Sequence, residues 1–345
     1  MDFLAQPNLP DLINYSLVAP RIKVLYVPTT KVACSTLKLL ISQAEGSYNA
    51  QAAQEIITPN ISQEQTIHNY RVHGLTRLFD LPRKKQWEVI ESSEWLRVAA
   101  LRDPIKRAYS SWENRAFLRA PGTPQSILDM CGDVMVDGHV DVAATFKKFA
   151  RAIHNDRVAF AIDDHFRPQF NTLYSNQLEY HHRIYIDRPG EMQTLADAIN
   201  ARAGTSVKLQ RLNSGLGIKA DQIFDKETAD LIADTYHEDY EWFGFERHNF
   251  TAPSTSLVLN PIQQALLNNL RETTERLTIV SRAAFHRVGF RYGLSQMRKS
   301  LWIRITKITN GLVSSATTSQ RHPLHWFLTQ FNKRYSTTCV KPPSD

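Results

Sequence analysis

Short apolar runs alternate with longer amphipathic segments over the first 250 residues. The runs at 22–27 and 96–101 are apolar apart from one charged residue each, as in a strand that is buried on both faces. The run at 182–187 alternates and predicts another strand. Apolar residues recur with a helical period in four segments: 37–41, 140–153, 189–202 and 225–242. Strands that alternate with helices predict an α/β fold with a mainly parallel sheet flanked by helices.

The first predicted strand leads through a polar turn into a helix. Pro28 ends the strand, and Lys31, Ser35 and Thr36 lie in the joint. Such a joint directs backbone N–H groups and the positive end of a helix dipole at one point, which suits a phosphate or sulfate. An ordinary turn whose Ser and Thr only cap the helix explains this segment equally well.

A second joint follows the run at 96–101. Arg102-Asp103-Pro104 ends the predicted strand, and Ser110 lies two turns into the helix that Pro104 begins. If this helix folds back beside the strand, Arg102 and Ser110 reach the same phosphate, one with a planar fork of donors and the other with a hydroxyl. Alone, the Asp-Pro pair predicts only a helix start. The two joints together are a much stronger signal of a phosphate-binding site than either joint alone.

The two joints resemble the nucleotide-binding signatures of the carbohydrate sulfotransferases, a family of glycan sulfotransferases that includes the chondroitin type. Residues 30–36 (TKVACST) are similar to its 5′-phosphosulfate loop P-K-V-A-C-T/S, with Thr30 in place of the usual Pro. Residues 102–110 fill every fixed position of its 3′-phosphate signature R-D-P-x-x-R-x-x-S. Residues 236–245 (YHEDYEWFGF) are similar to its closing motif Y-x-x-D-F-E-L-F-G-Y. The resemblance spans residues 20–247.

The resemblance implies a P-loop-like fold and 3′-phosphoadenosine-5′-phosphosulfate (PAPS) as the co-substrate, with no metal. It implies that Lys31 meets the leaving oxygen and that Arg102 and Ser110 hold the 3′-phosphate. The 5′-phosphate is expected on the loop formed by Lys31, Val32, Ala33, Cys34, Ser35 and Thr36. Like phosphoryl transfer, sulfuryl transfer depends chiefly on positioning and on offsetting charge at the leaving oxygen.

The acceptor hydroxyl needs a base, and related glycan sulfotransferases take it from the chain between the two nucleotide segments. His68 and His73 lie there. Gly74 lets backbone come close beside His73, which favours His73 over His68. A histidine that caps a loop or hydrogen-bonds in the core is the alternative for either position.

The segment His165-Phe166-Arg167-Pro168-Gln169 is expected to contact the acceptor. Pro168 forces Arg167 into extended geometry, so a loop presents His165, Arg167 and Gln169 together. Glycan hydroxyls, carboxylates or sulfates suit such a group. Nucleotide contact and a purely structural loop are the alternatives.

The composition fits a globular enzyme, with 42% hydrophobic and 22% charged residues. Cys34, Cys131 and Cys339 are too few and too scattered for a disulfide framework or a zinc site. The first residues lack the pattern of a signal peptide, and no apolar run approaches the ~20 residues of a membrane span. Animal members of the family resemble type II membrane proteins, so we expect a soluble, cytoplasmic, microbial relative.

The charge is distributed unevenly along the chain. Residues 251–345 carry 13 Lys and Arg against 3 Asp and Glu, whereas residues 1–250 carry 28 against 31. A Pro/Ser/Thr-rich stretch at 251–256 marks the change. We therefore predict a sulfotransferase domain at 1–250 and a basic, mostly helical C-terminal extension at 251–345. The extension suits peripheral contact with an anionic membrane, an acidic polymer, or packing as an appendage or oligomer interface.

These features predict a PAPS-dependent sulfotransferase that acts on a hydroxyl of a carbohydrate or glycolipid. A phosphoryl-transfer enzyme of similar fold is disfavoured, because the sequence contains no G-x-x-x-x-G-K-[ST] motif and no evident magnesium-holding acids after either strand. A protein that binds nucleic acid or another polyanion through its basic tail is a second alternative. The first 250 residues are net acidic and hold no recognised reader motif, so we expect no nucleic-acid partner.

Overall fold

The computed structural model describes residues 9–56, 63–175, 177–210, 212, 215–253 and 257–280. By its contacts the chain divides into two units, residues 1–281 and 282–345, and the described residues all belong to the first. The boundary that the sequence predicts after residue 250 falls within this unit. Most of the predicted basic extension, from residue 281 on, lies outside the described residues.

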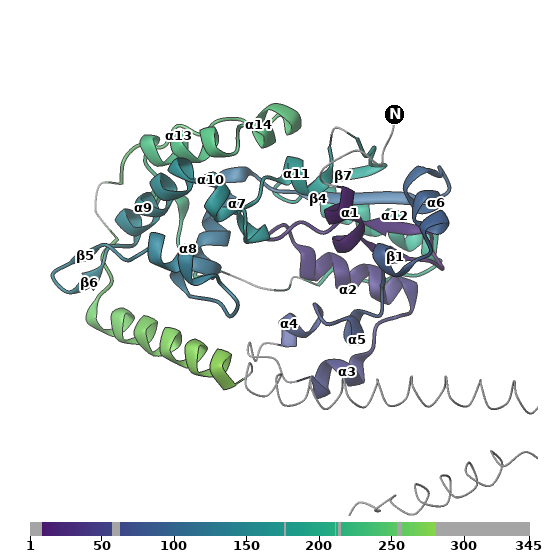
Figure 1. The fold of residues 1–345 in the computed structure, drawn as a ribbon, viewed down its shortest axis with the longest axis horizontal. Coiled ribbons are helices and arrows are strands. Elements are labelled where there is room, and N and C mark those ends of the chain that lie inside the picture. The colour runs from purple at the N-terminus through teal and green to yellow at the C-terminus, as the bar shows by residue number, and fades with distance from the viewer. Residues whose placement is uncertain are drawn as a thin grey trace, which may run out of the picture. The chain divides into compact units, whose positions relative to one another are not determined.

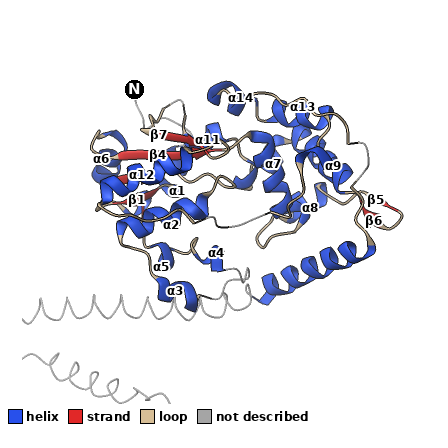
Figure 2. Ribbon diagram, turned by 180° about the vertical axis from the view of Figure 1, so that it is seen from behind, coloured by secondary structure: helices blue, strands red, loops and turns tan. Residues whose placement is uncertain are grey.

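A five-stranded mixed sheet forms the centre of one part of the unit (Figures 1 and 2). Its strand order is β3 (Thr76–Arg77), β1 (Leu17–Ala19), β2 (Val24–Tyr26), β4 (Leu96–Leu101) and β7 (His182–Tyr185). The strands β2, β4 and β7 are parallel, in a register that pairs Tyr26 with Val98 and Leu101 with Tyr185. The strand β1 pairs antiparallel with both β2 and β3. The predicted α/β class is confirmed, but the predicted mainly parallel sheet is wrong, because two of its four strand pairs are antiparallel.

Helices cover both faces of this sheet, which explains why its central strands are apolar throughout. Val24 and Val98 point to the face covered by α2 (Cys34–Glu45) and α12 (Glu191–Ala203). Leu25 and Ala99 point to the opposite face, where residues of α1 (Leu9–Tyr15), α6 (Arg83–Glu91) and α11 (Gln169–Leu173) complete a second core. Burial on both sides removes the alternation expected of a half-exposed strand.

A separate aromatic core lies beside the sheet among helices. Trp112, Phe146 and Phe149 are fully buried there, with ring centroids 5.0 Å apart for Trp112–Phe146 and 5.6 Å for Phe146–Phe149. The surrounding elements are α7 (Pro104–Trp112), α8 (Gln125–Met130), β6 (His139–Val140), α9 (Val142–Asn155), α10 (Arg157–Phe160) and α13 (Lys226–Thr235). The exposed β5 (Met135–Val136) pairs with β6. The helix α7 starts at the end of β4 and ends in the aromatic core, so it joins the sheet to that core.

The remaining elements are short. They are α3 (Ala50–Glu55), α4 (Gln63–Thr66), α5 (Tyr70–His73), η2 (Leu78–Asp80), η3 (Glu113–Phe117), η4 (Asp164–Phe166), η5 (Ala220–Gln222) and α14 (His237–Phe243). The helix predicted at 225–242 is in fact two, α13 and α14, interrupted at Tyr236. The buried Tyr236 hydroxyl donates to the Phe166 carbonyl at 3.0 Å, and this tertiary bond fixes the break.

Residues 257–280 pack onto the aromatic core, although they lie beyond the predicted boundary. Leu259 N–H donates to the Val140 carbonyl at 2.9 Å, and residues 261–280 are helical. Leu267 is 6% exposed within the core, and Arg271 pairs with Asp133 at 2.6 Å. In the part of the chain that the structure describes, no helix is long and apolar enough to cross a membrane.

Candidate active site

A cleft of about 1970 Å³ opens where β2, β4 and β7 end. Its walls carry residues that follow each of these strands within two positions, among them Pro28, Arg102 and Asp187. Ligands of open α/β sheets bind at this edge. The predicted site residues that line the cleft are Lys31, Ala33, Cys34, Ser35, Thr36, His68, Arg102, Ser110, His165 and Arg167.

The loop between β2 and α2 has an unusual backbone. Lys31 and Ala33 adopt positive φ angles, 62° and 50°, although neither is a glycine. Such conformations cost about 1–3 kcal/mol each and persist where the surroundings enforce them. Between them, the Val32 side chain is fully buried and anchors the loop. The loop therefore delivers the start of α2, at Cys34, to the floor of the cleft.

Lys31 lies among other cations in this cleft. Withdrawal from water lowers the pKa of Lys31 to about 8, and the nearby charges of Arg102 and Arg115 act in the same direction, against the negative charge of Glu113. The Arg102 guanidinium also donates from Nη1 to the Lys31 carbonyl at 3.2 Å. Several positive charges thus converge without an equal number of carboxylates, which is the electrostatic setting of an anion site.

Arg102 has a donor that no described group accepts. Its Nε is fully buried and has no hydrogen-bond partner among the described residues. Burial lowers the pKa of Arg102, while Asp187 and Asp103 oppose that change. Buried donors are nearly always paired in folded proteins, so the Arg102 guanidinium keeps unused hydrogen-bonding capacity at the wall of the cleft.

Gln169 holds the Arg102 backbone and does not face the cleft. Its side-chain oxygen accepts from Arg102 N–H at 2.9 Å, and its amide nitrogen donates to the Arg102 carbonyl at 2.8 Å. Gln169 is fully buried, and its own N–H donates to the Asp239 carboxylate at 3.0 Å. Of the three residues expected to contact the acceptor, His165 and Arg167 line the cleft and Gln169 lies behind it.

Arg107 is a site residue to which the sequence reasoning assigned no role. It is 1% exposed, and its guanidinium donates to the Thr30 carbonyl at 3.0 Å, to the Arg167 carbonyl at 2.8 Å and to the Asp164 carbonyl at 3.4 Å. One buried side chain therefore ties the Lys31 loop to the loop at 163–168. The signal for it was present, as the second fixed Arg of R-D-P-x-x-R-x-x-S.

The two histidines predicted as the base lie in different surroundings. His68 lines the cleft, with Nε2 2.8 Å from Ser35 Oγ and Nδ1 3.1 Å from Lys38 Nζ. Desolvation in the cleft, with the charge of Lys38, lowers the pKa of His68 well below its usual value. A lysine ammonium only donates, so Nδ1 is the acceptor and Nε2 carries the proton.

His73 lies behind the cleft wall at 4% exposure, and its Nδ1 accepts the Leu75 N–H at 2.9 Å. Burial lowers the pKa of His73 to about 4, and Lys38 adds to this. The close approach expected at Gly74 is present, because a Cβ there would lie 2.4 Å from the Ser47 carbonyl oxygen. It serves the packing of α5 against Ser47.

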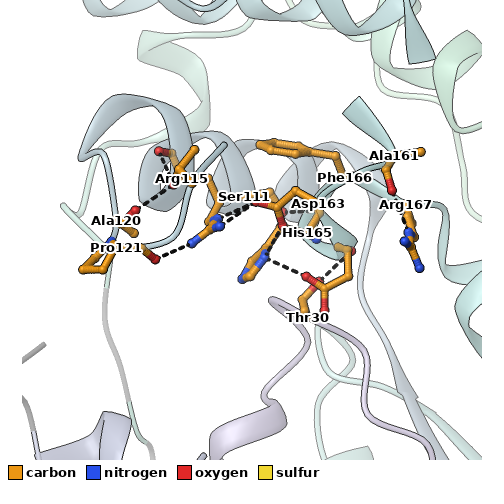
Figure 3. A network of polar contacts seen from close by, with 12 residues as sticks. Thr30, Ser111, Arg115, Ala120, Pro121, Ala161, Asp163, His165, Phe166 and Arg167 are labelled. Atoms are coloured by element: carbon orange, nitrogen blue, oxygen red, sulfur yellow. Dashed lines mark hydrogen bonds and ion pairs between the residues drawn. The ribbon is translucent and has the colours of Figure 1, made fainter. Parts of the chain in front are cut away.

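A chain of polar contacts links Arg115, Asp163 and His165 beside the cleft (Figure 3). The Asp163 carboxylate is 2.7 Å from Arg115 Nε through Oδ2 and 2.7 Å from His165 Nδ1 through Oδ1. Asp163 is 3% and Arg115 11% exposed in their side chains, whereas His165 is 24% exposed. Arg167 turns aside and donates from Nε to the Ala161 carbonyl at 2.7 Å.

Arg115 reaches this wall because α7 continues into the π-helical turn η3. The wider turn also brings Glu113 to the cleft, where its carboxylate accepts Leu216 N–H at 2.9 Å. A Cβ at Gly215 would lie 2.6 Å from that carboxylate, so a larger residue there would shift the Glu113 side chain. Sequence reasoning missed Arg115 and Glu113, since a helical period does not reveal a π turn.

Asp163, Asp164 and His165 also bring their ligand atoms within 4.8 Å of one another, as in a metal site. The Arg115 guanidinium already occupies the Asp163 carboxylate. A cation bound there must displace it. In this structure His165, Asp163 and Arg115 therefore form a hydrogen-bonded histidine–carboxylate–arginine group.

A model of the sulfotransferase family matches residues 14–246, well over half of the chain. The chain therefore belongs to the sulfotransferase family, as the motifs predicted, and the match ends one residue before the end of the predicted resemblance. No curated protein and no solved structure gives a significant match.

Proposed function

We propose that this sulfotransferase takes its sulfuryl group from PAPS and transfers it to a hydroxyl of a carbohydrate or glycolipid. The observation that carries the proposal is that Lys31 and Arg102, which follow the parallel strands β2 and β4, line the same cleft. PAPS has two negatively charged ends, a phosphosulfate and a 3′-phosphate. The site offers two cationic side chains, Lys31 and Arg102, one for each end.

The roles of the residues follow from their places around the cleft. The start of α2 and the loop before it supply backbone N–H groups for the 5′-phosphate, in a P-loop-like arrangement. The Lys31 ammonium offsets the charge that develops on the leaving oxygen. Arg102 and Ser110 hold the 3′-phosphate, in accord with their shared position on the cleft wall.

The proposal of a saccharide acceptor rests on the size of the cleft and on the residues that line it. Pockets for small ligands measure about 300–1000 Å³, and this cleft of about 1970 Å³ leaves room beside a nucleotide for a saccharide. His165 and Arg167 line the cleft, which is compatible with their assignment to the acceptor side. The basic residues beyond position 281 favour an acceptor that is anionic or lies on an anionic surface.

A transfer assay tests the proposal. The full chain is incubated with PAPS and a panel of neutral and acidic oligosaccharides and one glycolipid, and 3′-phosphoadenosine-5′-phosphate (PAP) and the mass of the products are measured. We expect PAP release coupled to a sulfated product, and about a hundredfold lower turnover for Lys31→Ala. The exposed Lys84, on α6, gives the matched control Lys84→Ala, which should be unaffected. Phosphate transfer from ATP with no PAP release from PAPS would overturn the proposal.

A further inference from the structure

We propose that His165 is the general base that takes the proton of the acceptor hydroxyl, with Asp163 and Arg115 as its positioning residues. The inference rests on the proposed function and deepens it. The predicted candidates were His68 and His73, so this assigns the role to a different segment of the chain.

The hydrogen bond to Asp163 sets the proton on the His165 ring. An ionised carboxylate only accepts, so the contact of 2.7 Å places the ring proton on Nδ1 and leaves the lone pair on Nε2. Burial raises the pKa of Asp163, but the bonds from His165 and the charge of Arg115 outweigh it and hold that pKa below its usual value. The carboxylate therefore stays ionised and stabilises the imidazolium that forms when the ring accepts a proton.

The unprotonated nitrogen of His165, Nε2, is part of a ring that lines the cleft. Among the described residues Nε2 has no hydrogen-bond partner, and the ring lines the cleft. The backbone beside it is fixed, because Ser111 Oγ donates to the His165 carbonyl at 2.8 Å and Thr30 Oγ1 donates to the Asp164 carbonyl at 3.2 Å. The second bond places the His165 turn next to the residue that precedes Lys31 (Figure 3).

The two predicted candidates lack such a nitrogen. Nδ1 of His68 faces the Lys38 ammonium and its Nε2 proton faces Ser35, so neither nitrogen offers a free lone pair. Nδ1 of His73 is used by Leu75 N–H, and the ring does not line the cleft. These contacts give His68 the role of holding Ser35 and Lys38, and His73 the role of closing its own turn.

The step balances without any further reactant. The acceptor oxygen attacks the sulfur of PAPS and forms the new S–O bond, and its proton moves to His165 Nε2. The bond from sulfur to the bridging phosphate oxygen breaks, and its electron pair stays on that oxygen, beside Lys31. The products are a sulfate ester, PAP and a protonated His165, which then releases its proton to water.

The kinetic test uses the full chain and PAPS alone, with water as the acceptor, and follows PAP release. His165→Gln should lower the rate by about a hundredfold, within the range expected for general base catalysis. The dissociation constant of PAP, measured by calorimetry on the same variant, should stay within about twofold of wild type. The exposed His154, on α9 and outside the cleft, gives the control His154→Gln, which should keep the full rate.

The second measurement is independent of turnover. In a ¹⁵N-histidine NMR spectrum, the His165 signal is identified by its absence in the His165→Gln variant. In the wild-type protein this signal should show a protonated Nδ1 and an unprotonated Nε2. Both Asp163 and Asp164 have a carboxylate oxygen within 3.0 Å of Nδ1, so the double variant Asp163→Asn/Asp164→Asn should abolish this tautomer preference. It should also lower the rate while PAP still binds, which merely structural carboxylates would not do. If hydrolysis of PAPS is too slow to measure, the tautomer decides alone.

Each outcome bears on one claim. Failure of the wild-type chain to bind PAP overturns the proposed function, whatever His165 does. A His165→Gln protein with unchanged rate, or a ring protonated on Nε2, overturns the base assignment and leaves the proposed function standing. A hundredfold loss in His68→Gln beside a normal His165→Gln would return the role to His68.

Discussion

The guanidinium of Arg107 donates to the backbone carbonyl of Thr30 at 3.0 Å, inside the protein. The same side chain donates to the Arg167 carbonyl, so the loops that carry Lys31 and His165 are fixed to each other before any substrate arrives. Fixed positions are what transfer chemistry of this kind requires, since its acceleration comes from orientation and preset charge.

Loss of the Arg107 side chain should cost both stability and nucleotide binding. Arg107→Ala leaves the Thr30, Asp164 and Arg167 carbonyls without their donor, and we expect about 3 kcal/mol less free energy of unfolding. Urea denaturation measures this change, and calorimetry should show weaker PAP binding. The matched control is Arg151→Ala, whose side chain is 56% exposed in its pair with Glu227 and should cost under about 1 kcal/mol. Equal losses in the two variants would contradict the clamp.

PAP binding should weaken as the pH rises through the pKa of Lys31. Burial lowers this pKa to about 8, so the ammonium that attracts the anion is lost above that pH. Between pH 7 and 9 we expect about a tenfold rise in the dissociation constant of PAP. Lys31→Arg keeps its charge over this range and should remove the trend, because arginine stays protonated. Calorimetry at several pH values checks both; a flat wild-type profile would show that Lys31 does not face the phosphates.

His68 should act on binding. Its ring joins Ser35 Oγ and Lys38 Nζ, both on α2. His68→Ala removes these two contacts at the proposed 5′-phosphate site, and we expect roughly tenfold weaker PAP binding, since one hydrogen bond contributes about 0.5–1.5 kcal/mol. Calorimetry measures the change. Unaltered PAP affinity would argue that His68 does not organise the α2 terminus.

The helix at 261–280 should be part of the folded unit. Leu267 is 6% exposed and Leu266, its neighbour, is 64% exposed. Leu267→Ala should therefore lower the free energy of unfolding by about 2–5 kcal/mol, and Leu266→Ala should change it by less than about 0.5 kcal/mol. Denaturation of the two variants forms a matched pair. Similar small effects in both would place this helix outside the cooperative unit.

The sequence predicted the fold where local pattern and burial agree. The strand predicted at 96–101 is β4, residue for residue, because burial on both faces leaves a nearly continuous apolar run. The antiparallel strands β1 and β3 were not predicted, since three and two residues are too short to show a period. The break at Tyr236 depends on a bond to Phe166, which no local pattern encodes.

The candidate site was predictable where motifs carry it. Lys31, Arg102 and Ser110 were found from two joints of strand and helix, and all three line one cleft. The contacts of Arg107 and Asp163 span distant segments, so only the folded chain reveals them. The same limit explains why Gln169 was expected at the acceptor and is instead buried behind Arg102.

The central claim, a site for a 3′-phosphorylated adenosine nucleotide, is tested most directly by calorimetric titration of the full chain with PAP and with AMP. A charge-assisted contact of the 3′-phosphate contributes about 1.5–3 kcal/mol, so PAP should bind roughly ten- to a hundredfold more tightly than AMP. In Arg102→Ala this preference should disappear, while AMP affinity changes little. Equal affinity of the wild-type protein for PAP and AMP would contradict the account.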